Sequence, residues 1–345
     1  MEPWLSIVIP VYNAGKYIKR AIDSIINQNI NGVEIIVVDD GSTDNSYTIC
    51  EQIAGICNQV KLIHSENKGV SHARNVGMSC ANGEWISFLD ADDYLIESRL
   101  SLMQQATSGN EDLIVFNYIR DNTPSNREDE EILVMESKEA IKVLLDFERY
   151  RVLLPSSMKK NHSVFKSCWG KLYRKSLIQS NGIVFQETLT LSEDMCFNLE
   201  YMRHIKSVMV IDCEVYNYSN NFESVTHTFS EKKFLGRQQI ISYLKCVDGL
   251  EKECELAKQK YVILTVLQLA EQIGTVNSEE LNKKYIALLK QYEIMKSASN
   301  RIDRQFSISA KQNCYLNIQY WMLKHRMYNA ILILGRIYAK IRGQK

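Results

Sequence analysis

The stretch ISFLDADDY, residues 86–94, ends an apolar run in three carboxylates within four residues. These are Asp90, Asp92 and Asp93. Burying like charges without compensation is costly, so the three carboxylates either face water at the start of a helix or surround a cation. A second acidic pair, Asp39 and Asp40, ends the apolar run VEIIVVDD. Because Mg²⁺ and Mn²⁺ prefer oxygen ligands, these residues allow the binding of a divalent cation and a polar, hydroxyl-rich ligand.

The elements that would position these acids alternate between strand-like and helix-like patterns over the first third of the chain. Apolar runs predict strands over residues 5–10, 33–40, 60–64, 84–89 and 112–119. Helical spacing falls between them, and Ser42 or Thr43 is the predicted cap of the second helix. This alternation predicts an α/β fold with a mostly parallel sheet flanked by helices. The ligand crevice of such a sheet lies at the carboxyl ends of its strands, so the two acidic groups should meet there.

The rest of the chain is predicted to be less regular and then helical. Ser192 caps a predicted helix whose first turn holds Glu193 and Asp194. Two short strands are predicted over residues 207–211 and 214–218, and the pattern is helical in the C-terminal third. The predicted domains are residues 1–225, which form the α/β domain, and residues 226–345, which form a helical region.

The composition excludes several classes of protein. Lys+Arg and Asp+Glu both total 41 in 345 residues, so no overall basic charge points to nucleic acid. The nine cysteines form no CxxC pair, which is typical of reduced thiols in a cytoplasmic protein. We expect neither a signal peptide nor a membrane span, because the start lacks a basic segment before a long apolar core and no apolar run is long enough. The sequence leaves a homo-oligomer open.

Six stretches, taken together and in this order, resemble the inverting family 2 glycosyltransferases of the GT-A fold. They read SIVIPVYNAGKYIKRAIDSIINQ, EIIVVDDGSTDNS, NKGVSHARNVGM, GEWISFLDADDYL, WGKLYRKSLI and SEDMCF. The likeness is strongest to bacterial capsule, exopolysaccharide or O-antigen enzymes. It implies a GT-A, Rossmann-like fold and the transfer of a hexose or N-acetylhexosamine from a UDP-sugar to a hydroxyl of a glycan, commonly a lipid-linked one.

The resemblance also implies which residues bind the nucleotide-sugar. They are Pro10, Val11, Tyr12, Asp39, Lys68, Arg74, Asp90, Ala91, Asp92, Trp169 and Lys171. Asp92 would carry Mn²⁺ or Mg²⁺, Asp90 would approach the ribose, and Asp39 would contact the nucleobase. A carboxylate can accept from the imide N–H of uracil, which favours UDP.

Each of these roles has a structural alternative. Residues 10–12 would line the base pocket, although Tyr12 could equally be a core tyrosine. Lys68 or Arg74 would reach the base or the diphosphate, unless both lie on a solvated helix face. Trp169 and Lys171 match a W-x-K-L element that would floor the sugar site; otherwise they are a core tryptophan and a surface lysine.

The inverting reaction needs a general base on the acceptor hydroxyl, and Asp194 matches the family's base. Glu193 is the secondary candidate, and Asp93 is expected to start a helix. Without the other motifs, Glu193 and Asp194 would be read as first-turn acids that stabilise the helix dipole.

One departure from the family concerns the diphosphate. Many relatives carry an arginine in the loop downstream of the base, where this chain has Asn220 or Asn221. His227 could contact a metal or phosphate, although a loop histidine without such a role is favoured.

Other classes of protein fit less well. A phosphohydrolase would need a D-x-D-x-T nucleophile motif, and DADD lacks the threonine. No G-x-G-x-x-G follows the first strand, which disfavours a dinucleotide-dependent oxidoreductase. A catalytically inactive nucleotide-sugar-binding scaffold of a polysaccharide assembly complex stays as the alternative.

The C-terminal tail, residues 320–345, has six Lys or Arg and no acid. Its apolar residues recur at helical spacing, and such a basic amphipathic helix can lie on an anionic membrane surface. We therefore expect a cytoplasmic protein in peripheral contact with the inner face of the cell membrane. Packing of the tail on the catalytic domain is the alternative.

Overall fold

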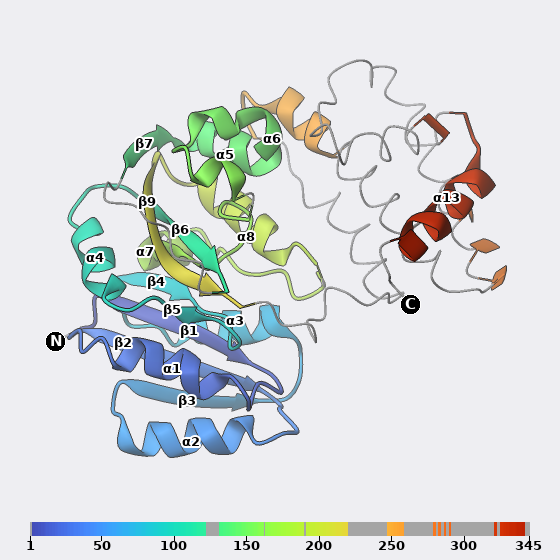
Figure 1. Ribbon diagram of the computed structural model, residues 1–345. Coiled ribbons are helices and arrows are strands. Elements are labelled where there is room, and N and C mark those ends of the chain that lie inside the picture. The colour runs from blue at the N-terminus through green and yellow to red at the C-terminus, as the bar shows by residue number, and fades with distance from the viewer. Residues whose placement is uncertain are drawn as a thin grey trace. The chain divides into compact units, whose positions relative to one another are not determined.

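The chain divides into two compact units, Met1–Phe222 and Glu223–Lys345 (Figure 1). The computed structural model describes residues 2–121, 131–161, 163–189, 191–219, 247–258 and 325–341, together with positions 279–280, 282–283, 286–287, 290 and 321–322.

A parallel sheet forms the N-terminal half of the first unit. Its strands are β1 (Leu5–Val11), β2 (Val33–Asp40), β3 (Val60–Ser65) and β4 (Trp85–Phe88), in the spatial order β3-β2-β1-β4. Every residue of β1 and nearly every residue of β2 is buried, as continuous apolar runs predict for strands covered on both faces. The predicted α/β alternation is confirmed.

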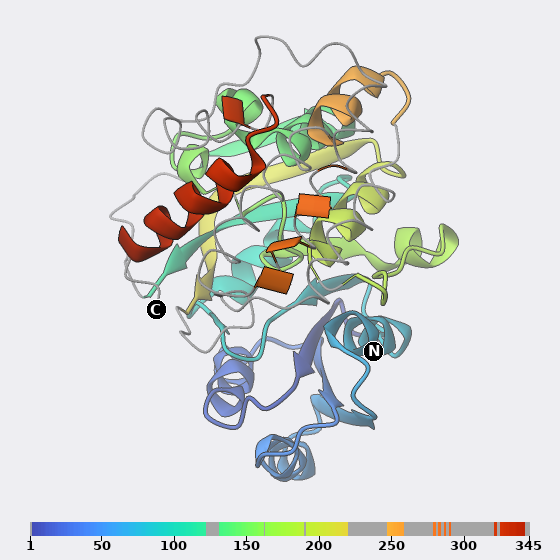
Figure 2. The same ribbon diagram turned by 90° about the vertical axis from the view of Figure 1, so that its right-hand side faces the viewer.

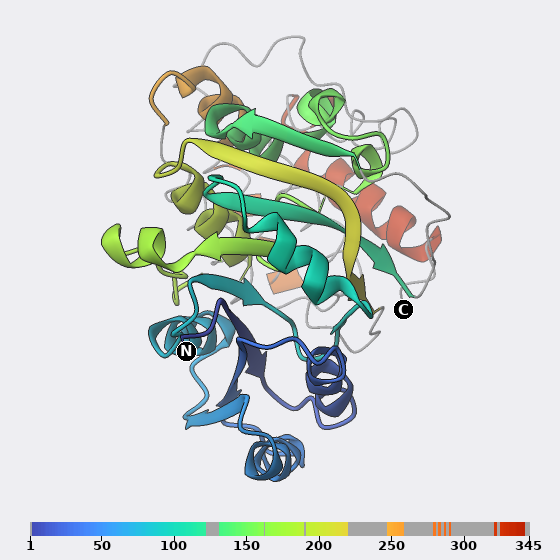
Figure 3. The same ribbon diagram turned by 90° about the vertical axis from the view of Figure 1, so that its left-hand side faces the viewer.

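Helices α1 (Ile18–Ile26), α2 (Ser46–Ile56) and α3 (Val70–Ser79) connect these strands. The views in Figures 2 and 3 place α1 and α3 on opposite sides of the sheet. Helix α3 lies so close to β1 that a Cβ atom on Gly77 would stand 2.3 Å from Cγ1 of Val8. Only a residue without a side chain fits at this crossing.

The predicted cap of α2 is wrong. The helix begins at Ser46, three residues after Thr43, with Asn45 at the N-cap position. Ser42 and Thr43 instead bind Asn13, because the Ser42 hydroxyl accepts from the Asn13 N–H and the Asn13 side-chain oxygen accepts from the Thr43 N–H. These side chains therefore join the ends of β1 and β2.

The other half of the sheet mixes strand directions. Its strands are β5 (Tyr94–Leu95), β6 (Leu113–Arg120), β7 (Ile132–Glu136), β8 (Lys171–Arg174) and β9 (Ser207–Tyr218). Strand β8 is antiparallel to β4 and β6, strands β5 and β7 are antiparallel to β9, and only β6 and β9 pair in parallel. Parallel pairs therefore join β1 to β2, β1 to β4, β2 to β3 and β6 to β9. The two short strands predicted after residue 206 form the single long strand β9, and the β6–β9 register shifts between Phe116 and Tyr118.

Helices complete the described part of the chain. They include α4 (Arg99–Ala106), α5 (Ser137–Leu145), α6 (Phe147–Tyr150), α7 (Lys175–Ser180) and α8 (Glu193–Met202), with short 3₁₀ turns at Arg151–Leu153 and Met158–Lys160. In the second unit, residues 251–258 are helical and α13 spans Tyr328–Ile341. Aromatic rings pack α8 on the sheet, since Phe88 of β4 meets Phe197 of α8 edge-on at 5.8 Å. None of the described helices is long and apolar enough to cross a membrane.

Candidate active site

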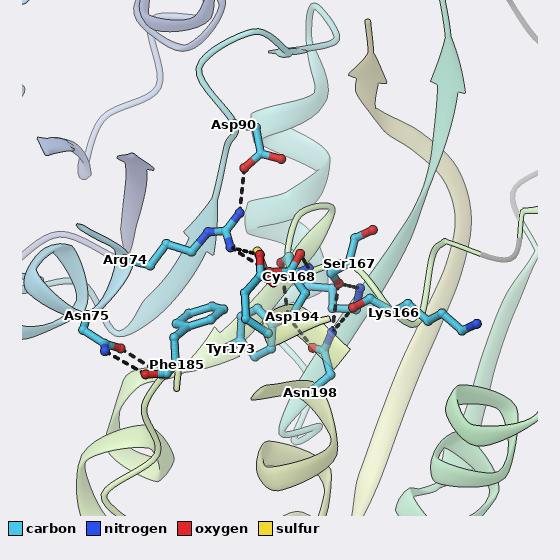
Figure 4. A network of polar contacts seen from close by, with 12 residues as sticks. Arg74, Asn75, Asp90, Lys166, Ser167, Cys168, Tyr173, Phe185, Asp194 and Asn198 are labelled. Carbon is cyan, nitrogen blue, oxygen red and sulfur yellow. Dashed lines mark hydrogen bonds and ion pairs between the residues drawn. The ribbon is translucent and has the colours of Figure 1, made fainter. Parts of the chain in front are cut away.

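A buried arginine gathers three carboxylates at the carboxyl end of β4. The guanidinium of Arg74, on α3, donates from Nη1 to Oδ1 of Asp194 at 2.7 Å and from Nη2 to Oδ1 of Asp90 at 2.9 Å (Figure 4). Glu193 lies 3.5 Å from the same Nη1 atom. Arg74 is only 4% exposed. One acid of the run after β4, Asp90, is therefore paired with a cation, and that cation is Arg74.

The cluster stabilises the charge of Arg74 but disfavours the charged forms of Asp90 and Glu193. Burial raises the pKa of the Asp90 carboxyl, and burial together with the Asp194 charge raises the pKa of Glu193 to about 7. Burial alone would lower the pKa of Arg74, but Asp194, Asp90 and Glu193 outweigh it and raise that pKa. The guanidinium thus stays charged, and it also lies 5.3 Å above the ring of Phe185.

Asp194 is held on both of its oxygens. Its Oδ2 accepts the backbone N–H of Cys168 at 3.0 Å, while its Oδ1 faces Arg74. The Cys168 loop is in turn fixed by Asn198 of α8, whose side-chain N–H groups donate to the carbonyls of residues 165–167 (Figure 4). The predicted base therefore has a fixed orientation.

Lys171 does not lie where we expected it. It is completely buried, and its ammonium donates to the carbonyl oxygens of Val164, Ser167 and Trp169. Burial lowers the pKa of Lys171 to about 7, while the three carbonyl acceptors favour its charged form. The lysine that we placed at the donor sugar instead supports the loop that carries Cys168 and Trp169. Neither the sugar site nor the surface alternative anticipated this position, because the sequence alone does not show three carbonyls turned inward.

Trp169 and the DADD turn meet at Tyr216 of β9. The indole of Trp169 stacks on the Tyr216 ring, with centroids 4.5 Å apart and planes 11° apart. The Tyr216 hydroxyl donates to Oδ2 of Asp93 at 2.5 Å and accepts the Asp90 N–H at 3.3 Å. Tyr216 therefore joins the predicted sugar-site tryptophan to the predicted metal-binding turn.

Asp93 is not a helix-start residue. It is buried, its Oδ1 accepts the Ser219 N–H at 2.8 Å, and the next helix, α4, begins at Arg99. Burial and the nearby Asp90 charge raise the pKa of Asp93 to about 8. Its carboxyl group therefore ties the turn to Tyr216 and Ser219.

Asp92 is the acid of this turn that is left for a ligand. Its side chain is partly exposed and makes no hydrogen bond or ion pair within the described part of the chain, whereas its backbone carbonyl accepts from Arg20 at 2.6 Å. No three His, Cys, Asp or Glu side chains of the described residues converge as a complete metal cage. Mg²⁺ and Mn²⁺ need no such cage when substrate phosphates and waters complete their shell. Asp92 fits a site of that kind.

The residues predicted to contact the nucleobase lie at the neighbouring strand ends. Asp39 is completely buried; its Oδ2 accepts from Nδ1 of His64 at 2.8 Å and from the Ser42 N–H at 3.3 Å. Its Oδ1 is buried and has no partner among the described residues. Tyr12 is 50% exposed, which leaves its ring available for stacking.

Other predicted residues take different positions. Pro10 and Val11 are buried in β1, and Ala91 is buried in the turn after β4. Lys68 is exposed, while the Lys68 and Gly69 N–H groups donate to Asp40 and so fix the start of α3. Arg74 contacts the carboxylates rather than the base end. The three loop residues discussed above, Asn220, Asn221 and His227, lie outside the described residues.

Sequence reasoning missed His64, Tyr216 and Arg20. A signal existed for His64, because it ends a predicted strand and pairs in register with Asp39. Nothing in the sequence marked Tyr216 or Arg20, since each meets the DADD turn from far along the chain.

Residues 6–182 match the model of the family described as glycosyl transferase family 2. The chain therefore belongs to this family, and it is a glycosyltransferase with a GT-A fold.

Among its relatives, the chain is 28% identical over 311 residues to an uncharacterized glycosyltransferase, EpsJ of Bacillus subtilis, covering 86% of each chain. It is 28% identical to the poly(ribitol-phosphate) beta-N-acetylglucosaminyltransferase TarP of Staphylococcus aureus, covering 68% of each. Its fold matches the structure of S. aureus TarS 1-349 in complex with UDP-GlcNAc with a TM-score of 0.69 at 18% identity, over 100% of this chain and 93% of that one.

Proposed function

We propose that this chain is a metal-dependent inverting glycosyltransferase that moves a hexose or N-acetylhexosamine from a UDP-sugar to a hydroxyl of a glycan. The observation that carries the proposal is the single guanidinium of Arg74, which brings Asp90 of the DADD turn and Asp194 of α8 together. A UDP donor is supported by the UDP-GlcNAc complex of TarS and by the buried Oδ1 of Asp39, which lacks a donor. A lipid-linked acceptor in bacterial surface polysaccharide synthesis is the proposed context.

Each side of the site has a distinct task in this proposal. Asp92 would hold Mn²⁺ or Mg²⁺ and Asp90 would approach the ribose, and the ion when bound would neutralise the leaving diphosphate as a Lewis acid. Tyr216 and Arg20 hold the turn that carries these carboxylates. Trp169 would form an apolar wall for the sugar, because its ring is fixed against Tyr216.

Asp194 would accept the proton of the acceptor hydroxyl. A carboxylate has about four lone-pair sites, and Arg74 and Cys168 take one on each oxygen of Asp194. The Cys168 thiol also hydrogen-bonds this carboxylate, which leaves one lone-pair site for the hydroxyl while the other bonds keep the group oriented. The proton lost from the hydroxyl moves to Asp194 as the oxygen attacks the anomeric carbon and the diphosphate leaves.

The first experiment measures UDP release from UDP-glucose, UDP-galactose, UDP-GlcNAc and UDP-GalNAc with and without Mn²⁺. We expect metal-dependent UDP release from one of them. Calorimetric binding of UDP without any release, even with lipid-linked glycan extracts as acceptor, would support the inactive scaffold instead. If the protein neither binds UDP nor releases it from any of these donors, the proposal of a UDP-sugar enzyme is contradicted.

The C-terminal helix supports the proposed contact with an anionic membrane. In α13, Ile331 and Leu332 are buried, whereas Ile333 and Ile337 are about half exposed and lie one turn apart. The tail sequence around them is basic and has no acid. We expect the full chain to float with anionic liposomes and a variant that ends at Asn317 to stay in solution. Equal flotation of both chains, or of neither, would remove this role from the tail.

A further inference from the structure

The two oxygens of the Asp39 carboxylate differ in the number of hydrogen bonds that they accept. Oδ2 takes two donors, Nδ1 of His64 at 2.8 Å and the Ser42 N–H at 3.3 Å. Oδ1 takes none among the described residues, although it is buried. A buried acceptor without a donor costs about 1–3 kcal/mol, so a ligand N–H placed there would be favoured.

His64 is held in a position from which it donates to Oδ2 of Asp39. It lies directly opposite Asp39 in the parallel register of β2 and β3. The Tyr47 ring packs edge-on against the imidazole, with centroids 5.2 Å apart. A carboxylate oxygen accepts, so Nδ1 carries the hydrogen in this contact. The imidazole is 58% exposed, which means that its role in folding is small.

The nucleobases differ in how many donors they offer to such a carboxylate. Uracil presents one imide N–H between two carbonyl oxygens. Guanine presents two parallel donors, the ring N–H and the exocyclic amine, which suit both oxygens of one carboxylate. Adenine and cytosine present a ring nitrogen that accepts, which a carboxylate repels. An Asp39 with Oδ2 already filled can serve one N–H but not the parallel pair.

We infer that His64 is a specificity residue, which fills Oδ2 of Asp39 and so selects uracil over guanine nucleotides. This inference rests on the proposed function and names the part of it that chooses the nucleotide. Filling Oδ2 disfavours the wrong base, while the open Oδ1 favours the right one. Because Oδ1 is buried, base binding requires a covering side chain to move. Tyr12 is half exposed and follows Val11, the register partner of Asp39, so it stands at the same end of the sheet.

The experiment compares calorimetric binding of UDP and GDP, with Mn²⁺, to the wild type and to two variants of the full chain. His64→Leu places a methyl group near the position of Nδ1 and removes the donor. His64→Asn keeps an N–H at the same distance from the backbone and is the matched control. A bidentate base contact is worth about 1–3 kcal/mol, so His64→Leu should lower the preference for UDP over GDP about tenfold. His64→Asn should keep that preference within about twofold.

The outcomes separate the inference from the proposed function. A wild type that binds UDP while His64→Leu keeps the full preference overturns the inference and leaves the proposed function in place. A loss of preference in both variants also overturns it, because the donor would then not be the cause. A wild type that binds neither nucleotide overturns both. If His64→Leu does not fold, His64→Ala serves instead, since it also removes the donor to Asp39 and should lower the preference for UDP over GDP in the same way.

Discussion

Asp39 and Asp194 are two carboxylates that the fold places in opposite situations. Asp39 is completely buried and keeps one oxygen without a donor, while a histidine and a backbone N–H share the other. Asp194 is 19% exposed, and each of its oxygens has a partner, one of them the cation Arg74. A buried oxygen without a donor favours recognition of a ligand N–H. A partly exposed carboxylate fixed on both sides is suited to proton transfer, because its orientation is set before the substrate arrives.

The largest effect should come from removing the proton acceptor. Asp194→Asn keeps the shape of the side chain but cannot take a proton, so we expect transfer to fall about 10³-fold while UDP binding changes little. The measurement is UDP release with a confirmed acceptor, beside calorimetric UDP binding. Glu193→Gln is the matched control, since it alters the adjacent acid. If Glu193→Gln loses more activity than Asp194→Asn, the roles of the two acids are reversed.

The second effect concerns the cation that distinguishes the two carboxylates. Arg74→Met leaves three acids around a buried apolar side chain, so we expect the free energy of unfolding to fall by about 3–5 kcal/mol in urea denaturation. Lys19→Met is the control, because the Lys19–Asp23 pair on α1 is exposed and should contribute less than about 1 kcal/mol. Equal losses for the two variants would show that Arg74 is not the charge on which the cluster depends.

A third carboxylate, Asp92, belongs to neither situation, because its side chain has no described partner. We expect Asp92→Ala to weaken UDP binding in Mn²⁺ about tenfold or more, to the level that the wild type shows in EDTA. Glu97→Ala removes an exposed acid from the same segment and should leave the metal dependence intact. UDP binding by Asp92→Ala that still responds to Mn²⁺ would place the ion elsewhere.

The last prediction tests Glu193, whose pKa rises from its ordinary 4.5 to about 7 in the folded chain. The folded protein therefore holds this proton more tightly than the unfolded chain does. The resulting stability is complete below pH 4.5 and is lost as the pH rises to about 7. We expect Glu193→Gln to be more stable than the wild type at pH 8, on the order of 2 kcal/mol, and similar to it at pH 4.5. A stability difference that does not change with pH would contradict this burial.

Much of the fold could be predicted because its signals are local. The apolar runs of β1 and β2 and the helical spacing of Ile18, Ala21, Ile22 and Ile25 need no knowledge of distant contacts. The prediction that Ser42 or Thr43 caps α2 was wrong because Asn13, some thirty residues earlier, binds both residues. The antiparallel pairing of β8 with β4 and β6 was not predicted for a similar reason, since these strands come from distant parts of the chain.

The site divides in the same way. The DADD turn and the acids of α8 stand out as sequence motifs, so their residues could be named. Arg74 could be named as a candidate from the family resemblance, but its pairing with these acids could not, because Arg74 precedes Asp194 by 120 positions. Lys171 shows the converse, since a lysine is expected at the surface and only the inward carbonyls of its own loop explain its burial.

The close crossing of α3 over β1 makes the position of the Arg74 cluster depend on the missing side chain of Gly77. Gly77 lies three residues after Arg74, on the same side of α3, and Val8 leaves no clearance for a methyl group there. Any side chain at this position would lift the helix from the sheet and carry the guanidinium away from Asp90 and Asp194. A substitution at residue 77, which touches no ligand, would therefore act as an active-site mutation.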